Sequence, residues 1–261
     1  MYSINETYLD KEKEKLFEIK TNSLRKNFEK RRINVHTFLK KADIFRFIEE
    51  FITTRAEIKN IAFSDSVTLY QLGMYDWFES QATDKGYVIN QPLKRSRTGQ
   101  FAVFGEEPPG KMNIPYDIWK PKNDRWYQGL RDSLTSDLLV IGANAITMNG
   151  EIVSVDGIGN RVSGMIFGPK HVLCIVGRNK IVNDIDSALD RIHNYSAPLN
   201  YIRHNSKHST NFDELPCLQI GKCVKCSNLE SACLNTVIIR GQVKQHQDRI
   251  HLLIINDELG F

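Results

Sequence analysis

The sequence has no long apolar run. No stretch of its 261 residues approaches the roughly 20 consecutive apolar residues that a membrane-spanning helix needs. The first residues, MYSINETYLDKEKEK, lack the apolar core that a secretory signal peptide requires. Together these absences predict a protein that is not inserted in a membrane and that resides in the cytoplasm.

The sequence also has little excess charge of either sign. Its 35 Lys and Arg residues against 31 Asp and Glu residues leave a formal net charge of +4. The basic run RKNFEKRR, residues 25–32, is interrupted by glutamate and has few aromatic neighbours, so a solvated helix face explains it well. Nucleic-acid binding through this region, which would depend strongly on salt, is therefore only an outside alternative.

Familiar catalytic fingerprints are missing as well. The sequence holds no Walker-type phosphate loop and no dinucleotide-binding fingerprint. It also shows no Ser/His/Asp or Cys/His arrangement of the kind that nucleophilic enzymes use. No nucleophile or general base is assigned from motifs, and the question of whether the chain is an enzyme stays open.

Cysteine is scarce outside one short segment. Four of the five cysteines lie in PCLQIGKCVKCSNLESAC, residues 216–233, with the spacing C-x5-C-x2-C-x6-C. The fifth, Cys174, lies within the apolar run HVLCIVG and is predicted to be a buried core thiol. Disulfides are rare in the cytoplasm. The cluster therefore predicts metal ligands: Cys217, Cys223, Cys226 and Cys233.

Two kinds of metal centre suit clustered thiolates, an iron–sulfur cluster and zinc. Structural zinc usually takes two separated CxxC-type pairs, and here only Cys223 and Cys226 form one. The compact wrap of the segment favours a 4Fe–4S cluster, with zinc as the alternative and free reduced thiols as the third option. His204 and His208 lie upstream and could replace a cysteine ligand, although a polar surface loop explains them more simply.

Hydrophobic periodicity predicts an α/β domain behind an N-terminal helical segment. Residues 1–55 have the pattern of two charged amphipathic helices that pack on the main domain, residues 56–261. In the main domain, Asn149-Gly150 between two alternating runs predicts a β-hairpin. Further apolar runs predict strands at 59–63, 138–142, 171–177, 235–241 and 249–257, and helices are predicted at 66–81, 160–167 and 178–194.

Residues 91–121 form a proline-rich insertion in this domain. They contain five of the eight prolines, together with aromatic residues and the basic run KRSR. Long irregular segments in compact domains are usually functional lids or binding loops, or else disordered. A lid and a surface excursion with no active role explain this insertion equally well.

Two strand-to-helix turns have the character of anion sites. Residues 156–161, DGIGNR, form a glycine-rich turn that opens a helix, where free backbone N–H groups and the helix dipole attract anions. Arg161 could add a bidentate clamp. Residues 64–68, SDSVT, form the second turn, which an ordinary helix cap by Asp65 or Ser66 also explains. Ligands of open α/β sheets bind beyond the carboxyl ends of strands, so a small anionic molecule, carboxylate or phosphate, is expected there.

Three stretches resemble a known family. Residues 142–182, GANAITMNGEIVSVDGIGNRVSGMIFGPKHVLCIVGRNKIV, resemble the signature region of the LUD domain, the lactate-utilisation family. SVTL at 66–69 is similar to the family's G-G-S-x-T-L turn, with Asp65 in place of a glycine. Residues 216–233 resemble the cysteine tail of a subset of the family. The insertion at 91–121 is longer than the family's usual connection.

The resemblance implies a three-layer α/β/α sandwich with a mixed sheet, similar to the ribose-phosphate isomerase and CoA-transferase group. It implies a metal- or iron–sulfur-containing component of small organic acid metabolism, of the lactate type, working beside an iron–sulfur or redox partner protein. A homo-oligomer stays open, as does the competing hypothesis of a non-catalytic ligand-binding or assembly module stapled by zinc. The family fold would bring these residues into one pocket: Ser66, Thr68, Asn144, Thr147, Asp156, Gly157, Gly159, Asn160, Arg161, Asn179 and Lys180.

Overall fold

The structure is a computed structural model that describes residues 6–94, 116–208, 212–229 and 231–261. Its helices are α1 (Glu6–Lys30), α2 (Lys41–Thr53), α3 (Val67–Leu72), α4 (Met74–Lys85), α5 (Tyr116–Asp132), α6 (Asn160–Ile166), α7 (Ile185–Arg191), α8 (Ala197–His208) and α9 (Pro216–Gln219). Its strands are β1 (Asn34–Phe38), β2 (Asn60–Phe63), β3 (Val88–Asn90), β4 (Leu138–Gly142), β5 (Ala145–Thr147), β6 (Ile152–Asp156), β7 (His171–Gly177), β8 (Ile181–Val182), β9 (Asn235–Ile239) and β10 (Ile250–Ile255).

The proline-rich insertion predicted at 91–121 lies mostly outside the described residues, since these omit 95–115. Its last residues begin α5, which contains Pro121. Across the described parts of the chain, no helix combines the length and the apolar character needed to cross a bilayer.

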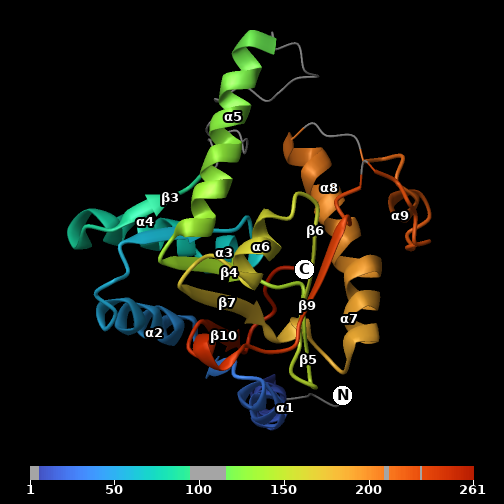
Figure 1. The fold of residues 1–261 in the computed structure, drawn as a ribbon. Coiled ribbons are helices and arrows are strands. Elements are labelled where there is room, and N and C mark those ends of the chain that lie inside the picture. The colour runs from blue at the N-terminus through green and yellow to red at the C-terminus, as the bar shows by residue number, and fades with distance from the viewer. Residues whose placement is uncertain (1–5, 95–115, 209–211, 230) are drawn as a thin grey trace.

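A six-stranded sheet in the order β1-β10-β7-β4-β2-β3 forms the centre of the fold (Figure 1). Each neighbouring pair of its strands runs parallel. Parallel sheets are covered on both faces, so their strands are apolar throughout rather than alternating with polar residues. The runs LLVIG and HVLCIVG have this composition, and both become central strands, as the sequence predicts.

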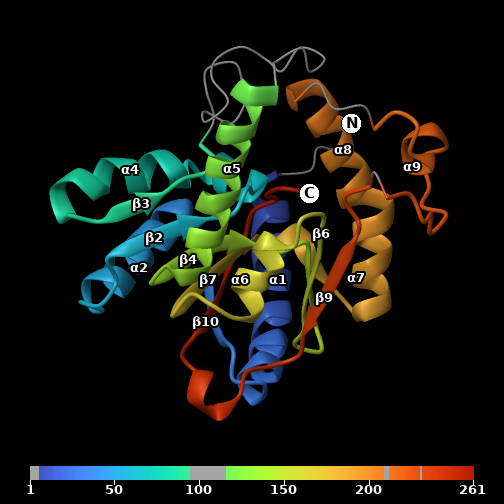
Figure 2. The ribbon, with the colours of Figure 1, turned by 45° about the horizontal axis from the view of Figure 1, so that its top comes forward.

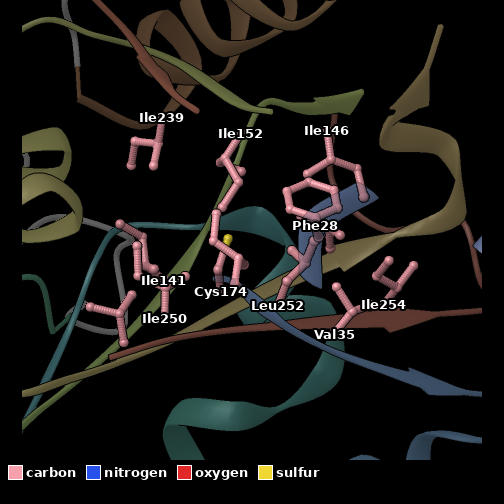
Figure 3. Close-up of a cluster of buried hydrophobic side chains, with 14 of the residues drawn as sticks. Phe28, Val35, Ile141, Ile146, Ile152, Cys174, Ile239, Ile250, Leu252 and Ile254 are labelled. Atoms are coloured by element: carbon pink, nitrogen blue, oxygen red, sulfur yellow. The ribbon is translucent and has the colours of Figure 1, made fainter. Parts of the chain in front are cut away.

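Helices cover both faces of this sheet. On one face, Val140, Ile175 and Leu253 pack against α2, α3 and α4. On the other face, Cys174 lies between Ile141 of β4 and Leu252 of β10. Figure 3 shows this second face, where α1 and a smaller sheet supply the side chains opposite. The predicted three-layer α/β/α architecture is confirmed, and Cys174 is buried as expected.

The smaller sheet has the order β8-β5-β6-β9 and contains the predicted hairpin. Its strands β5 and β6 are antiparallel, and Gly150 between them has φ +91, a conformation that glycine adopts without strain. One face of this sheet supplies Ile146, Ile152 and Ile239 to the core of the main sheet. The other face packs against α7, so that the small sheet lies between the main sheet and α7 (Figures 1 and 2).

The N-terminal segment contains the two predicted helices and also a strand that was not predicted. Strand β1 pairs with β10 at the edge of the main sheet, and Phe38 belongs to this strand rather than to a helix. Helix α1 buries Leu24 and Phe28 completely in the common core. The strand is short and carries polar residues, as edge strands often do, and its apolar pattern is therefore weak in the sequence.

The helix predicted at 178–194 begins later and runs further. A 3-10 turn, Arg178–Lys180, and strand β8 come first. Asp184 then caps α7, because its Oδ1 accepts a hydrogen bond of 2.8 Å from the Ser187 N–H. A π-helical turn, Ile192–Ser196, joins α7 to α8. Residues 178–183 are therefore not part of a regular α-helix, and Lys180 in this segment is buried.

Candidate functional site

A cavity of about 290 Å³, called here the central cavity, lies beyond the carboxyl ends of the parallel strands. Ser66 follows β2, Asn144 follows β4, Lys180 follows β7 and Gly260 follows β10, and all four residues line it. This is the position where open α/β sheets bind ligands. The predicted site residues that line the cavity are Ser66, Asn144, Asp156, Gly157, Asn160, Arg161 and Lys180.

The other four predicted residues have supporting positions. Thr68 is fully buried and its Oγ1 accepts a hydrogen bond from Lys180. Thr147 instead pairs with Glu151 within the hairpin. Gly159, at φ +91, starts α6. Asn179 accepts from the Leu259 N–H and donates to the Gly260 carbonyl, both at 3.1 Å, and so holds the last residues of the chain against the cavity.

The glycine-rich turn is held together by one of its own carboxylates. The carboxylate of Asp156 accepts hydrogen bonds from the N–H groups of Gly157 (2.9 Å), Arg161 (3.2 Å) and Val162 (3.4 Å). The protein's own carboxylate thus occupies two of the N–H groups at the start of α6. The turn also contributes a cationic side chain to the cavity.

Arg161 is that side chain. Its Nη2 donates to the carbonyl oxygen of Val155 at 2.5 Å and to Oδ1 of Asn144 at 3.2 Å. Its Nε is buried, and no group among the described residues accepts a hydrogen bond from it. A buried donor without a partner costs free energy. The two bonds of Nη2 fix the direction of the guanidinium.

Lys180 lies deeper in the wall of the cavity and is only 4% exposed. Its Nζ donates to Oγ1 of Thr68 at 3.0 Å and to the carbonyl oxygen of Ala143 at 2.9 Å. Burial, followed by the nearby guanidinium groups of Arg191 and Arg161, lowers the pKa of Lys180 to about 7. Near neutral pH a large share of this side chain is therefore an uncharged amine.

The remaining charges around the cavity are already paired. Asp65 forms an ion pair of 2.7 Å with Arg203, and both side chains are largely buried. Arg191 donates to the carbonyl oxygens of Asn144 and Asn179 and to the Ser196 hydroxyl. No sequence motif indicates the Asp65–Arg203 pair, because the two residues lie 138 positions apart. Arg161 also lines the cavity as a cation, and none of the ion pairs found among the described residues includes it.

A second cavity, called here the thiol cavity, has a volume of about 270 Å³. The four clustered cysteines all line it. Cys217 lies in α9, which Figure 2 shows beside α8. The backbone N–H of Cys223 donates to Oδ1 of Asn194 at 2.9 Å, which ties the loop to the π-helical turn. The fold therefore gathers the predicted metal ligands around one space.

The thiols of this cavity oppose one another's ionisation. Burial, followed by the neighbouring thiol groups, raises the pKa of Cys217. Burial also raises the pKa of Cys233. Within the described residues, no three His, Cys, Asp or Glu side chains come close enough together to hold one metal ion. The thiols of the described residues therefore share a cavity but do not form a closed metal site.

Tyr201 and Cys233 form a wall that the two cavities share. The Tyr201 side chain is 2% exposed, and its hydroxyl accepts from the Ala232 N–H at 3.0 Å and lies 2.9 Å from Sγ of Cys233. Burial raises the pKa of Tyr201, so the hydroxyl keeps its proton and can donate it to the sulfur. Tyr201 belongs to no motif, and only its proximity to the cysteines in three dimensions identifies it.

Comparison with known protein families identifies the family of this chain. The model of the LUD domain family matches residues 22–255. The chain belongs to the LUD domain family. The match begins within α1, so the LUD domain includes β1 and most of the N-terminal segment that the sequence pattern set apart from the main domain.

One solved structure also matches this LUD domain protein. It is described as a DUF162 family protein from Deinococcus radiodurans, and the match covers 83% of this chain and 99% of that one, with 10% sequence identity and a TM-score of 0.30. The search of curated proteins found no match.

Proposed function

We propose that this LUD domain protein is a component of small organic acid metabolism that binds a small carboxylate, of the lactate type, beside a metal centre held by its cysteines. The shared wall carries the proposal. Cys233 and Tyr201 face both cavities, so a group bound by the thiols would lie next to an acid in the central cavity. Membership of the LUD domain family supports the class of substrate.

The geometry of the central cavity suits a small acid. Arg161 offers the carboxylate a guanidinium whose direction is fixed by its bonds to Val155 and Asn144. Val155 and Ile192 add apolar surface to the lining, which suits the short carbon chain of such an acid. Binding would bury the carboxylate against a charged group of fixed direction, an arrangement that gives specificity as well as affinity.

For the thiol cavity we favour an iron–sulfur cluster over a single zinc ion, because only Cys223 and Cys226 form the CxxC pair typical of structural zinc. Four thiolates around this space match the ligand set of a 4Fe–4S cluster: Cys217, Cys223, Cys226 and Cys233. Such a cluster, when bound by all four cysteines, would supply electron transfer; Lewis-acid chemistry would need one iron without a cysteine ligand.

The side chains of the protein have separate tasks in this proposal. Arg161 binds and orients the acid through its carboxylate. Tyr201 donates its hydroxyl proton toward Sγ of Cys233, and hydrogen bonds to ligand sulfurs tune metal centres. Tyr201 also lies in the wall between the two cavities, so an acid in the central cavity would be next to the thiol cavity but outside it. An iron–sulfur or redox protein is the partner proposed for electron exchange.

The test begins with anaerobic expression in iron-supplemented medium, followed by metal analysis and a visible spectrum of the same sample. We expect a brown protein with about four irons per chain. Addition of L-lactate or pyruvate should then change the spectrum, because the acid binds beside Cys233. Arg161→Gln should remove this response, whereas Arg46→Gln, at an exposed position, should not.

Each part of the proposal can fail separately. A colourless protein with one zinc per chain would refute the cluster and would mean that the cysteine loop holds a structural zinc ion. Acid binding measured by calorimetry on the same sample tests the central cavity independently of the metal. If none of the small acids binds and Arg161→Gln changes nothing, the proposed function is wrong whatever the metal.

A further inference from the structure

We propose that Lys180 is a nucleophilic amine that condenses with the carbonyl carbon of a 2-oxo acid bound in the central cavity. This inference rests on the proposed function, because it narrows the small acid of that cavity to one chemical class. In this inference Lys180 forms a covalent bond with the ligand. The sequence alone suggests only an ionic contact between its ammonium group and an anionic ligand.

Two hydrogen bonds fix the position of the Lys180 amine. Nζ donates to Thr68 and to the carbonyl of Ala143, and Thr68 in turn donates to the carbonyl of Leu259 at 3.4 Å. A neutral amine has two N–H groups and one lone pair. Both N–H groups can therefore be engaged by the protein, which orients the nitrogen and leaves its lone pair for reaction.

The electrostatic surroundings keep this amine reactive. Lys180 forms no ion pair with any carboxylate in the described parts of the chain, and the charged groups that act on it most are the guanidinium groups of Arg191 and Arg161. Only an uncharged amine attacks a carbonyl. Enzymes that form imines with their substrates obtain such an amine by burying a lysine next to other cations.

The neighbouring Arg161 indicates the class of carbonyl compound. A 2-oxo acid carries its carboxylate on the carbon next to the ketone or aldehyde. Arg161 and Lys180 line the same cavity, and the Arg161 guanidinium is near enough to lower the pKa of Lys180. One group can therefore hold the carboxylate while the other meets the adjacent carbonyl carbon. A simple 2-hydroxy acid offers the same carboxylate but no carbon that an amine can attack.

The proposed step balances without any oxidant or reductant. The lone pair of Nζ forms a bond to the carbonyl carbon, the π electrons of the C=O bond move to the oxygen, and one of the two Nζ hydrogens passes to that oxygen as a proton, which gives a neutral carbinolamine. Loss of the hydroxyl group and one N–H hydrogen as water then gives the imine. The net change is amine plus 2-oxo acid to imine plus water, and hydrolysis reverses it.

The experiment traps this imine in the full-length protein. Protein is incubated near pH 7 with glyoxylate or pyruvate, reduced with sodium borohydride, digested and mapped by mass spectrometry. An ordinary lysine has a pKa near 10.4, so its uncharged fraction at pH 7 is roughly a thousandfold smaller than that of Lys180. We expect reduced adduct on Lys180 at a level at least about tenfold above that on exposed lysines such as Lys222.

Controls separate specific reaction from general labelling. Acetate and L-lactate should give no adduct. Lys180→Met should abolish labelling of this peptide, and Lys170→Met, which removes an exposed amine outside the cavity, should leave it intact. Because mapping is done on the unaltered protein, the result stands even if Lys180→Met folds poorly.

Calorimetry on the same samples distinguishes the two proposals. Binding of pyruvate without an adduct on Lys180 would overturn this inference and leave the proposed function in place. Labelling spread evenly over exposed lysines would also overturn it. If calorimetry detects no small acid at all, the proposed function fails, and this inference fails with it.

Discussion

Arg249, which immediately precedes β10, holds α6 in place from its far end. Its side chain is 6% exposed and donates three hydrogen bonds to carbonyl oxygens of Gly164 (2.7 Å), Met165 (2.8 Å) and Pro169 (2.9 Å). These carbonyls lie at the C-terminal end of the helix and in the turn behind it, where a positive charge also meets the negative end of the helix dipole. Methionine at this position would keep much of the volume and remove every one of these donors.

The loss can be estimated from the bonds themselves. A hydrogen bond to a charged group contributes about 1.5–3 kcal/mol to stability. Water can reach some of the freed carbonyls, so the three contributions will not add in full, and we expect Arg249→Met to cost about 3–5 kcal/mol of unfolding free energy. The total unfolding free energy of a single domain is about 5–15 kcal/mol, so this loss would be a large part of it. A fall in Tm of roughly 10 °C should follow.

Urea unfolding followed by circular dichroism measures this change. Arg249→Lys should be intermediate, because one ammonium cannot reproduce the fork of a guanidinium across three carbonyls. Arg46→Met, whose side chain is exposed and pairs only with Asp43, should change the unfolding free energy by less than about 0.5 kcal/mol. A loss below about 1 kcal/mol in Arg249→Met would refute the reasoning. Arg161 lies in the first turn of α6. We therefore also expect Arg249→Met to weaken acid binding.

Three further predictions test other parts of the fold. Burial lowers the pKa of His36 to about 4, so the folded state resists a proton that the unfolded chain accepts once the pH falls below 6.5. Between pH 6.5 and 4 the unfolding free energy of the unaltered protein should fall by about 2 kcal/mol more than that of His36→Gln, allowing for partial exposure, and parallel pH profiles in urea unfolding would contradict this. Phe28→Ala should cost about 3–5 kcal/mol in one cooperative transition, and Leu16→Ala, at a 52% exposed position on the same helix, far less; a separate early transition by calorimetry would mean that α1 folds independently. Gly168 has φ +117 and a Cβ there would lie 2.4 Å from the carbonyl oxygen of Leu134, so Gly168→Ala should cost at least about 1–3 kcal/mol, and an unchanged Tm would show that the turn can relax.

Local patterns in the sequence were sufficient for much of the architecture. The apolar runs at 138–142 and 171–177 predict buried strands, and the structure pairs them in parallel, as strands that are apolar on both faces often are. Asn149-Gly150 predicts the hairpin, because its turn needs residues that accept positive φ. The spacing of the cysteines identifies a thiol cluster, and the two turns at 64–68 and 156–161 identify part of the lining of the central cavity. In each case the information lies within a few neighbouring residues.

Other features arise only when distant segments meet. Strand β1 is recognised by its pairing with β10, more than 200 positions away. Lys180 becomes a buried amine because Thr68, 112 positions earlier, and the carbonyl of Ala143 enclose its Nζ. Tyr201 becomes part of the site because Cys233 packs against its hydroxyl. Periodicity and spacing report which face a residue turns inward, whereas burial, hydrogen-bond partners and pKa depend on what the rest of the chain places there, and that is decided by tertiary packing.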